Sequence, residues 1–474
     1  MNLELLSTAA YLISSVFFIV GIKKMSKVKT ARQGNAYAAF GMLIAIVMTL
    51  FNGDIISYEL IIAGIVIGAL IGAVLALRVQ MTAMPQMVAL LNGFGGIASL
   101  LVSSSEFNLA HDMDSFTSIT TFLGIFIGGV TFTGSLVAFG KLQGIVTEKS
   151  VMYPMQHYIN LILITISAFL GFLLADLAGF HLLDSVTLSV FSAPYEIVFA
   201  LVGLSLLLGI LLVIPIGGAD MPVVISLLNS YSGIAAAMTG FVIQNSVLII
   251  TGSLVGASGI ILTQIMCKSM NRSLINVLLG GFGNAPVAAK TGDKKEIIVK
   301  EVGVEEAAML FETATSVIVV PGYGMAVAQA QHVVRELSEL LQKRGATVKF
   351  AIHPVAGRMP GHMNVLLAEA NVPYEQLLEM DQINDEFANT DLALVIGAND
   401  VTNPAARHDK SSPIYGMPIL NVDKARTVII NKRSLNPGYA GIENELYGYP
   451  NALMYFGDAK EAISKLISEI KENS

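Results

Sequence analysis

The sequence predicts a protein in two parts. The first is a multi-pass α-helical membrane domain of about nine spans, and the second is a C-terminal α/β Rossmann-like domain with a doubly wound parallel sheet. Three observations predict this fold class. The composition, 54% hydrophobic and 13% charged with a mean hydropathy of +0.67, lies outside the range of soluble proteins. Apolar runs long enough to cross a bilayer recur from residue 5 to residue 267. Beyond residue 300, short β-rich runs alternate with helical patterns.

Length, charge and cysteine usage set further bounds. A chain of 474 residues is too long for one ordinary domain, and we expect a membrane domain over residues 1–268, a linker over 269–300 and a soluble domain over 301–474. The single cysteine, Cys267, excludes a disulfide within the chain. A net charge of −7 and a pI near 5.6 give no reason to expect nucleic acid as a partner, whereas the apolar runs require a lipid bilayer.

About nine stretches have the length and composition of transmembrane helices. They cover residues 5–22, 35–51, 60–77, 85–102, 116–140, 158–180, 195–216, 221–243 and 247–267. The first is not typical of a signal peptide, because its positive charges, beginning with Lys23 and Lys24, follow the apolar run instead of preceding it.

The charges of the loops predict the orientation of the spans. Threading the loops alternately places the basic residues on one side, and these are Lys23, Lys24, Lys27, Lys29, Arg32, Arg78, Lys141, Lys149, Lys268 and Arg272. The other side carries only acidic charges, which are Asp54, Glu59, Glu106, Asp112, Asp114, Asp184 and Glu196. Cytoplasmic loops are rich in Lys and Arg, so the basic side should be cytoplasmic. An odd number of spans then puts the N-terminus outside and the C-terminal domain in the cytoplasm.

The membrane half contains an internal duplication. The segment MPQMVALLNGFGGIA from Met84 matches MPVVISLLNSYSGIA from Met221, and the match aligns Asn92 with Asn229, 137 residues later. The span after each copy carries the sequence TGSLV. Four spans separate the copies, so the copies should point the same way and be related by an axis along the membrane normal.

Polar residues in or near the spans allow two interpretations. An amide within a span is unfavourable without a partner, so Asn92 and Asn229 could line a hydrated path or could hydrogen-bond neighbouring helices. Asp220 and His157 on the cytoplasmic side, and Asp176 toward the outer end of its span, could carry protons or could be solvated or interfacial. No Lys, Arg or Glu lies deep in a span, which argues against a fixed-charge ion channel. The glycines spaced for close helix packing are Gly64, Gly68, Gly72, Gly252 and Gly256.

The C-terminal half alternates strands with helices. Strands are predicted at Ser316–Pro321, Thr347–Ile352, Leu392–Ile396, 418–421, 427–431 and Ala452–Phe456. Helices are predicted at 325–344, 360–370 and 458–471, the last opening with a capping-box pattern of Asp458 and Glu461. Alternation on this scale is typical of a parallel, doubly wound sheet of about six strands.

The first of these strands leads into a candidate nucleotide site. The stretch VIVVPGYGMAVAQAQ places Gly322 and Gly324 in a turn between a strand and the start of a helix. Glycines there would let backbone N–H groups approach a pyrophosphate, and the helix N-terminus would add partial positive charge. The third glycine of the dinucleotide fingerprint is missing, because Val327 and Ala328 occupy that region. The motif alone could therefore be an ordinary Gly-rich turn.

The residues after the second and fifth predicted strands favour NADP(H) over NAD(H). An NAD site would place Asp or Glu at the end of the second strand, where this chain has AIHP leading to Arg358. Lys432 and Arg433 follow the fifth strand, and two cations suit the 2′-phosphate of NADP. The sequence NPGYAG behind them is typical of a Gly-rich lid. GANDVTNPAA from Gly397 follows the strand at Leu392–Ile396 in the same way.

The chemistry of a conventional dehydrogenase is not visible in the sequence. There is no separate substrate domain and no placed Tyr-Lys, His-Asp or zinc cluster, since His353, His362 and His408 are scattered. If a bound NADP reacts, its hydride partner must come from another polypeptide.

Essentially the whole chain resembles the β subunit of the proton-translocating NAD(P) transhydrogenase family. The motifs that carry the likeness are PGYGMAVAQAQ from Pro321, VAGRMPGHMNVLLAEA from Val355, GANDVTNPAA from Gly397, NKRSLNPGYAG from Asn431 and GGADMPVVISLLNSYSG from Gly217. The resemblance implies that hydride passes directly between NADP(H) on the C-terminal domain and NAD(H) on an α subunit, without a catalytic side chain or a metal. This transfer would be coupled to proton movement through the shared membrane domain. The α subunit would bring the NAD(H) domain and further membrane helices, in a dimer of αβ units in the bacterial inner membrane.

The resemblance also implies the site residues. The cofactor-binding set is Gly322, Tyr323, Gly324, Met325, Ala326, Val327, Arg358, Met359, Pro360, Gly397, Ala398, Asn399, Asp400, Lys432, Arg433, Ser434, Gly438, Tyr439, Ala440 and Gly441. Lys432 and Arg433 would hold the 2′-phosphate, and Asp400 would lie in a loop that couples the nucleotide state to the membrane. The proton path would include Asn92, Asp220 and Asn229.

One position departs from the family, because several bacterial relatives carry a His where this chain has Asn92. Asn does not titrate, so a proton-carrying group at this depth is either absent or supplied by another helix, which the α subunit could provide. The alternative function is an NADP-gated transporter or channel in which the Rossmann-like domain is only a sensor. The absence of a selectivity-filter motif such as TVGYG counts against that alternative.

Overall fold

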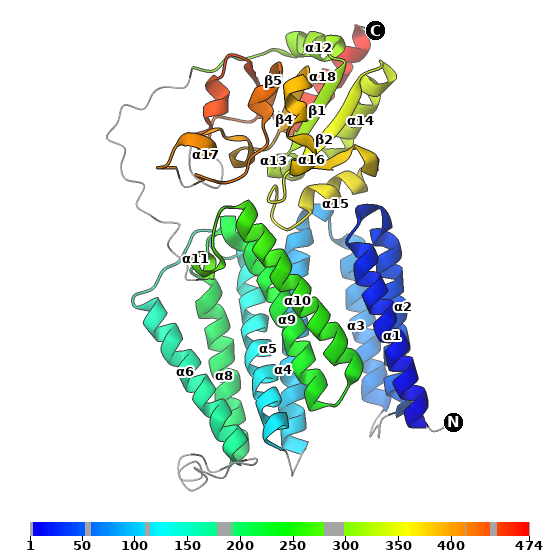
Figure 1. The fold of residues 1–474 in the computed structure, drawn as a ribbon, viewed down its shortest axis with the longest axis vertical. Coiled ribbons are helices and arrows are strands. Elements are labelled where there is room, and N and C mark those ends of the chain that lie inside the picture. Colours follow the sequence, from blue (N-terminus) through cyan, green and yellow to red (C-terminus); the bar gives the residue numbers. More distant parts are fainter. Residues whose placement is uncertain are drawn as a thin grey trace. The chain divides into compact units, whose positions relative to one another are not determined.

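The computed structural model describes residues 3–52, 58–109, 114–177, 191, 193–278, 298–412, 414–436 and 443–473. The chain divides into two compact units (Figure 1). One comprises Met1–Gly217 and Val224–Leu262, and the other comprises Gly218–Val223 and Thr263–Ser474. Most of the expected linker, and the end of the span predicted at 158–180, lie outside the described residues. The domain boundaries at 268 and 300 stay predictions.

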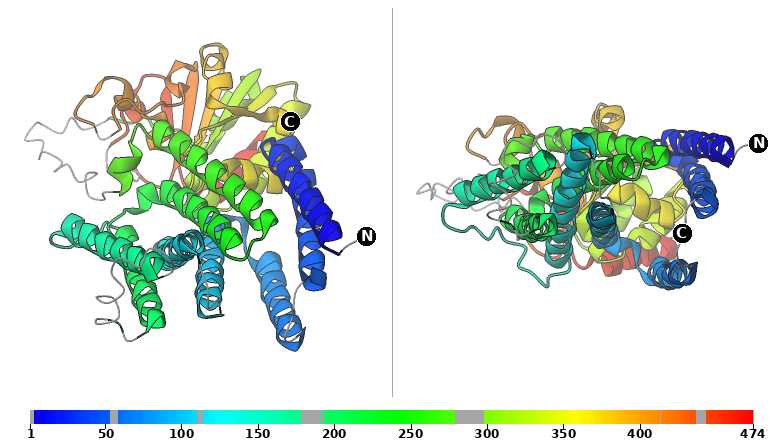
Figure 2. Two further views of the ribbon diagram at one scale, coloured as in Figure 1. Left: turned by 60° about the horizontal axis from the view of Figure 1, so that its bottom comes forward. Right: turned by 90° about the horizontal axis from the view of Figure 1, so that it is seen from below.

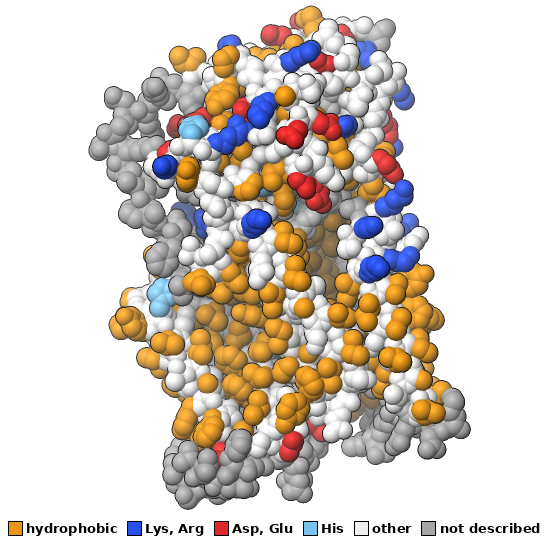
Figure 3. Space-filling model, viewed as in Figure 1, with side chains coloured by type: hydrophobic (Ala, Val, Ile, Leu, Met, Phe, Trp, Pro, Cys, Tyr) orange, Lys and Arg blue, Asp and Glu red, His pale blue; other side chains and the backbone are white. Residues whose placement is uncertain are grey.

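Nine of the described helices are long and apolar enough to cross a membrane, which confirms the predicted number. They are α1 (Leu3–Met25), α2 (Val28–Asn52), α3 (Tyr58–Arg78), α4 (Met84–Leu109), α5 (Ser115–Leu142), α6 (Gln156–Ala175), α8 (Pro194–Val213), α9 (Met221–Val242) and α10 (Ser246–Ser269). On the face shown in Figure 3, hydrophobic side chains cover these helices. Such a surface is suited to the lipid interior, because no water is present there to form hydrogen bonds with an exposed polar group.

Several of these helices pack through glycines that let two backbones approach. A Cβ added to Gly96 of α4 would lie 2.6 Å from the carbonyl O of Gly128 on α5. A Cβ on Gly252 of α10 would lie 2.5 Å from the backbone N of Ala237 on α9. The helices α1 and α2 form a hairpin (Figure 2), in which Ser14 Oγ donates to the carbonyl O of Gly41 at 2.7 Å.

The predicted close packing is therefore present at Gly252, and Gly256 also approaches α9. It is absent at the other group of glycines. A Cβ added to Gly64, Gly68 or Gly72 of α3 would meet no described atom of this chain within 4 Å. All described side chains of α3 are at least partly exposed, so this helix buries no face against the rest of the described chain.

The two duplicated helices, α4 and α9, lie side by side in parallel. Asn92 Nδ2 of α4 donates to the carbonyl O of Ile225 on α9 at 3.2 Å, across a sequence separation of 133 residues. Farther along the same pair, the hydroxyls of Ser103 and Thr239 lie 3.2 Å apart, across a separation of 136 residues. Both separations are close to the offset of the repeat, so equivalent parts of the two copies face each other, as expected for a parallel repeat.

The described part of the C-terminal unit contains a six-stranded parallel sheet, as predicted. Its strands are β1 (Ser316–Pro321), β2 (Thr347–Ile352), β3 (Leu377–Glu379), β4 (Leu392–Ile396), β5 (Thr427–Lys432) and β6 (Ala452–Phe456). The order β3-β2-β1-β4-β5-β6 is that of the doubly wound dinucleotide-binding fold. β4 is buried along its whole length, as expected for a strand covered on both faces.

The strand predicted at 418–421 is wrong. Those residues join no strand; instead the Leu420 N–H donates to the carbonyl O of Val401, and of the run only Ile419 and Leu420 are buried. Pro418 also lacks the N–H that a strand in the middle of a sheet would use. The sixth strand is the short β3, which has too few residues to give a period-2 pattern.

Helices cover the sheet, and short helices lie in the segments that connect its strands. They are α12 (Val304–Thr313), α13 (Tyr323–Val327), α14 (Gln331–Lys343), α15 (His362–Glu369), α16 (Met380–Ile383), α17 (Ala405–His408) and α18 (Ala459–Glu472), with α11 (Leu274–Leu278) before them in the chain. The 3₁₀ turns are η1 (Met81–Ala83), η3 (Gly218–Asp220), η5 (Tyr374–Gln376), η6 (Glu386–Asn389), η7 (Asp400–Thr402), η8 (Val422–Lys424) and η9 (Glu445–Gly448).

The single helix predicted at 325–344 is in fact two helices. The chain breaks at Gln329, whose φ of +51° is left-handed, and Ala330 donates back to the carbonyl O of Met325. This turn closes α13 before α14 begins. The predicted start of the last helix is confirmed, because the Asp458 carboxylate accepts from the N–H groups of Lys460 and Glu461 at the beginning of α18.

Candidate functional site

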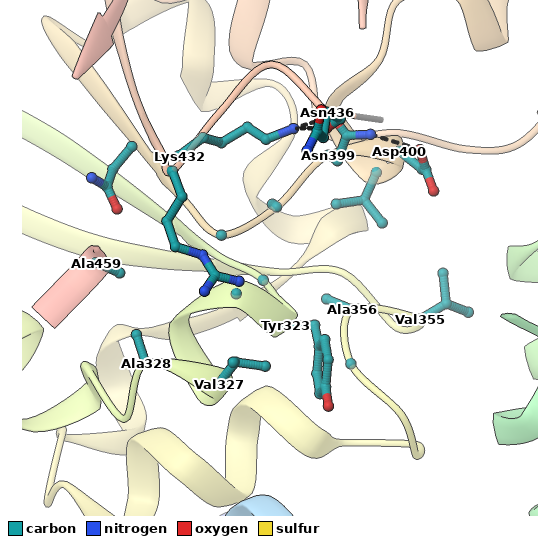
Figure 4. A pocket seen from close by; sticks show the side chains of 18 of the residues that line it. Tyr323, Val327, Ala328, Val355, Ala356, Asn399, Asp400, Lys432, Asn436 and Ala459 are labelled. Atoms are coloured by element: carbon teal, nitrogen blue, oxygen red, sulfur yellow. Dashed lines mark hydrogen bonds between the residues drawn. The ribbon is translucent and has the colours of Figure 1, made fainter. Parts of the chain in front are cut away.

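The carboxyl ends of β1, β4 and β5 surround a cleft in the C-terminal unit. β1 and β4 are neighbours in the sheet, but β2 and β3 come between them in the chain, so the strand order reverses at this point. Loops that leave a parallel sheet at such a point diverge and leave a crevice in which ligands bind. The fold therefore brings the predicted motifs at Gly322, Gly397 and Lys432 to one place. Figure 4 shows side chains that line this cleft.

The glycines of the first motif hold two of these loops together. A Cβ on Gly322 would lie 2.4 Å from Ala398 Cα, and a Cβ on Gly324 would lie 2.7 Å from Gly397 Cα. Gly397 itself has a left-handed φ of +67°, which a residue with a Cβ adopts only with strain. Direct contact between the loop after β1 and the loop after β4 explains why glycine stands at all three positions.

The backbone N–H groups of the same turn take part in this contact. The N–H of Gly322 donates to the carbonyl O of Ile396 at 2.9 Å, and that of Gly324 donates to the carbonyl O of Gly397 at 2.9 Å. Both amides therefore bond to the neighbouring loop in this structure. The expectation that they approach a pyrophosphate stays a prediction.

An aromatic side chain forms one wall of the cleft. Tyr323 lies with Arg358 over its ring, the guanidinium carbon 4.6 Å from the ring centroid, and with the ring of His362 6.2 Å away. Cation–π contact of this kind fixes the orientation of the ring. Arg358 does not line the cleft directly but acts on it through Tyr323.

Two buried histidines shape the loop after β2. His353 Nδ1 accepts from the N–H of Val355 at 3.2 Å, and its Nε2 lies 2.8 Å from the carbonyl O of Pro418. His362 Nδ1 accepts from the N–H of Arg358 at 3.1 Å. Burial lowers the pKa of each imidazole to about 4, and the nearby Arg358 adds to the effect at His362. Both rings are therefore neutral at physiological pH and serve as acceptors for backbone N–H groups.

Lys432, the last residue of β5, is held by hydrogen bonds at the wall of the cleft (Figure 4). Its Nζ donates to the carbonyl O of Asn436 at 2.8 Å, to Tyr447 Oη at 3.0 Å and to Asn399 Oδ1 at 3.4 Å. The Tyr447 hydroxyl donates to the same Asn399 oxygen. Burial lowers the pKa of Lys432, and the negative charge of Asp400 opposes that shift. The network keeps a cation beside the loop after β4.

Most of the predicted cofactor residues line the cleft. Those that do are Gly322, Tyr323, Gly324, Val327, Gly397, Ala398, Asn399, Asp400, Lys432, Arg433 and Ser434. Met325 and Ala326 are fully buried behind the turn, and Arg358, Met359 and Pro360 lie outside the lining. The predicted lid residues Gly438, Tyr439, Ala440 and Gly441 lie outside the described residues.

Sequence reasoning missed part of the wall. The additional lining residues include Ala328, Val355, Ala356, Gly357, Val401, Ile414, Met417, Asn431, Gly457, Asp458 and Ala459. Gly457 and the cap residue Asp458 follow β6, so the rule that ligands bind at the carboxyl ends of strands was the available signal. Val355 to Gly357 are apolar or small, and no chemistry in the sequence marks them.

The residues predicted for the proton path have different surroundings. Asn92 is buried, and its side-chain amide donates a hydrogen bond to the carbonyl O of Ile225. This bond joins helices α4 and α9. Asn229 of α9 is half-buried. Asp220 forms a bidentate ion pair with Arg272 Nη1, at 2.8 and 3.0 Å. Burial raises the pKa of Asp220, and the positive charge of Arg272 opposes this shift.

The other polar residues considered near the membrane also differ in exposure. His157 is exposed at the start of α6, in agreement with a solvated or interfacial position. Asp176, just beyond the end of α6, is fully buried, so the solvated-loop interpretation is wrong for this residue.

Comparison with known proteins agrees with this architecture over almost the whole chain. The family model described as NAD(P) transhydrogenase beta subunit matches residues 7–469. Two relatives named NAD(P) transhydrogenase subunit beta, from Rhodospirillum rubrum and from a named strain of that species, are each 50% identical to this chain over 471 residues. Each alignment covers 98% of this chain and 98% of the relative. The match includes the membrane helices as well as the sheet, and the chain therefore belongs to the NAD(P) transhydrogenase beta subunit family.

Proposed function

We propose that this chain binds NADP(H) in the cleft of its C-terminal domain and exchanges hydride with NAD(H) held on an α subunit, coupled to proton translocation across the membrane. The observation that carries the proposal is the cleft at the reversal point between β1 and β4. There Lys432 and Arg433 supply two cations, and no carboxylate follows β2. This combination favours a ribose that carries a 2′-phosphate.

The residues of the cleft fit a dinucleotide. Glycine backbones at Gly322 and Gly397 leave room where a Cβ would collide with the opposite loop. Tyr323 and Val327 offer apolar surface that can exclude water from a nicotinamide ring. Lys432 and Arg433 would neutralise phosphate charge. When bound, the nicotinamide ring supplies or accepts the hydride, and the protein contributes binding and orientation.

Direct hydride transfer between two nucleotides requires a partner subunit. Direct hydride transfer needs two nicotinamide rings in near contact, and one doubly wound sheet holds one dinucleotide. The Rhodospirillum rubrum relatives are named as beta subunits. We infer an α subunit that carries the NAD(H) domain and further membrane helices, in a dimer of αβ units. The bacterial inner membrane, with the N-terminus outside and the C-terminal domain in the cytoplasm, suits the distribution of Lys and Arg.

The ion pair of Asp220 and Arg272 suits a coupling element. Burial raises the pKa of Asp220, so this carboxylate takes up a proton more readily than an exposed one. Protonation would weaken its bond to Arg272, so the proton and the pairing are linked. Asn229, nine residues farther along the chain on α9, would hold water without titrating. A titrating group at the depth of Asn92 would then come from the α subunit.

Stopped-flow mixing tests this function against a sensor role for the domain. The purified chain is loaded with NADP⁺ and mixed with an α subunit that carries NADH, and absorbance follows hydride transfer. The proposal predicts formation of NADPH that requires both proteins. Tight NADP(H) binding without any transfer would instead support the nucleotide-gated transporter.

A further inference from the structure

The Lys432 ammonium gives all of its hydrogen bonds to acceptors of the C-terminal unit. A lysine ammonium has three N–H groups and no acceptor. Those of Lys432 point to the carbonyl O of Asn436 at 2.8 Å, to Tyr447 Oη at 3.0 Å and to Asn399 Oδ1 at 3.4 Å. Figure 4 shows the side chain directed toward Asn399 and Asn436. A phosphate oxygen that binds this ammonium must therefore replace one of the three protein acceptors.

Tyr447 and Asn399 are acceptors that Lys432 can leave without creating an unsatisfied buried group. The Tyr447 hydroxyl donates its own hydrogen to Asn399 Oδ1, and Asn399 Nδ2 donates to Asp400 Oδ1 at 3.0 Å. Burial raises the pKa of Tyr447, and the negative charge of Asp400 adds to this shift, so the hydroxyl keeps its proton at physiological pH. The Tyr447–Asn399 pair therefore stays hydrogen-bonded within itself when the ammonium moves away. The Asn436 carbonyl follows Lys432 in the same loop and gives the shortest bond, so we expect Lys432 to keep it.

The Tyr447–Asn399 pair is fixed in place from both sides. Tyr447 lies in η9 and is 4% exposed. The Asn444 side chain at the start of η9 accepts from the N–H of Leu446 at 3.0 Å and donates to the carbonyl O of Asn399 at 3.0 Å. Thr402 Oγ1 of η7 donates to the same carbonyl at 2.9 Å. Because the pair is held by these bonds, it cannot follow the ammonium toward a ligand.

We propose that the Tyr447–Asn399 pair competes with the 2′-phosphate of NADP(H) for the Lys432 ammonium, so that Tyr447 limits the affinity of the cleft for this nucleotide. The inference rests on the proposed function and adds Tyr447, a positioning residue outside the lining of the cleft. The bond from Lys432 to Tyr447 stabilises the protein before the nucleotide binds, and its loss on binding opposes the gain from the phosphate. NAD(H) has no 2′-phosphate, so its affinity does not depend on Tyr447.

Tyr447→Phe tests the competition, because it removes the hydroxyl and keeps the ring, whose centroid lies 5.1 Å from Lys432 Nζ. NADP⁺ and NAD⁺ are each titrated into the purified chain by calorimetry. We expect Tyr447→Phe to bind NADP⁺ roughly tenfold more tightly, as expected for one hydrogen bond to a charged group that no longer has to be given up. The affinity for NAD⁺ should stay unchanged. Tighter binding is a result that a merely structural role of Tyr447 would not produce.

Tyr455→Phe is the matched control. Tyr455 is also a buried tyrosine, 6% exposed, but its hydroxyl donates to the carbonyl O of Ala462 at 2.9 Å instead of bonding to Lys432 or Asn399. Thermal unfolding without nucleotide compares what each variant loses with its hydroxyl. Tyr455→Phe should bind NADP⁺ as the unaltered protein does, and equal tightening in both variants would overturn the proposal.

A double-mutant cycle tests whether Tyr447 acts through Lys432. In a Lys432→Ala background no ammonium is left to compete for, so adding Tyr447→Phe should leave the affinity for NADP⁺ unchanged. Tightening that persists in this background, or that extends equally to NAD⁺, would show that the effect does not pass through the ammonium and would reject the competition. Unchanged or weaker NADP⁺ binding in Tyr447→Phe alone also rejects it, because Lys432 would then keep its bond to Tyr447 when the nucleotide binds.

Titration of the unaltered chain separates this inference from the function on which it depends. If the unaltered chain binds NADP⁺ no more tightly than NAD⁺, the cleft does not recognise a 2′-phosphate, and the proposed function fails together with the inference. If the unaltered chain prefers NADP⁺, and only the comparison of Tyr447→Phe with Tyr455→Phe fails, the competition for Lys432 alone is rejected.

Discussion

In the proposed function, Lys432 and Arg433 decide which nucleotide the cleft accepts. Replacing both with Ala should weaken NADP(H) binding by roughly tenfold to a hundredfold per cation lost, as expected for hydrogen bonds to charged groups. NAD(H) lacks the 2′-phosphate, so its affinity should change little. Calorimetric titration of the purified chain measures both affinities, and the exposed Lys410→Ala is the control. Equal affinities for the two nucleotides in the unaltered chain would contradict the assignment.

The buried histidines give the C-terminal domain a specific response to acid. Burial lowers the pKa of His353 and His362 from 6.5 to about 4. Because the folded pKa is below the unfolded one, the two neutral rings stabilise the domain above pH 6.5, and this stability is lost as the pH falls toward 4. The carboxyl of Asp391 titrates lower, since hydrogen bonds from Thr315 hold its pKa at about 2.

Calorimetric unfolding of the domain at pH 7, 6, 5 and 4 measures this loss. His362→Gln should reduce the slope of stability against pH, because it removes one of the two buried imidazoles. A transition temperature that is constant from pH 7 to pH 4 would show that neither ring is kept neutral by burial.

At the level of single residues, the sequence indicates which charged side chains matter but not which residues they bond to. Lys432 and Asp220 were predicted from their positions beside a strand and a span. The bonds of Lys432 to Asn399 and Tyr447, and that of Asp220 to Arg272, join residues far apart in the chain. Such contacts depend on tertiary packing, which local pattern does not encode.

At the level of elements, the close approach of α9 and α10 depends on Gly252. Gly252→Ala would place a Cβ 2.5 Å from the Ala237 nitrogen and 2.6 Å from the Gly233 oxygen, both backbone atoms that cannot rotate away. We expect the helix pair to separate and the protein to lose about 1–3 kcal/mol of stability, the usual effect of overpacking.

Gly68→Ala in α3 is the matched control, because a Cβ there meets no described atom within 4 Å. Thermal unfolding in detergent of the chain alone compares the two variants. An equal loss of stability in both would mean that close backbone approach is not what Gly252 provides.

The elements differ in how far the sequence predicts them. Long apolar runs and buried β-branched strands are specified by composition alone, so the nine long helices and β1, β2, β4, β5 and β6 agree with prediction. The short strand β3 and the run at 418–421 exchanged roles, because both are brief apolar stretches and only the neighbouring chain decides which one pairs. The break at Gln329 was missed because a left-handed residue other than glycine leaves no local signal.

At the level of the whole molecule, the chain should be unable to turn over alone. The purified protein in detergent should bind NADP(H) yet catalyse no steady-state transfer from NADH, because one cleft places only one nicotinamide ring. Absorbance of NADPH over time measures this, and addition of the α subunit is the positive control. Sustained turnover without that subunit would show that the chain holds both rings.

The most direct test measures hydride transfer in the C-terminal domain and proton movement through the membrane domain in one experiment. The chain and its α subunit are reconstituted in sealed vesicles, and hydride transfer between NADPH and NAD⁺ is recorded together with the pH of the lumen. Coupled transfer should give a lumenal pH change that begins with hydride transfer and disappears when a proton carrier is added. Asp220→Asn should suppress both signals together, while leaving NADP(H) binding intact. Hydride transfer without any lumenal pH change in the unaltered protein, or an ion flux that depends on NADP(H) without hydride transfer, would contradict coupled transfer.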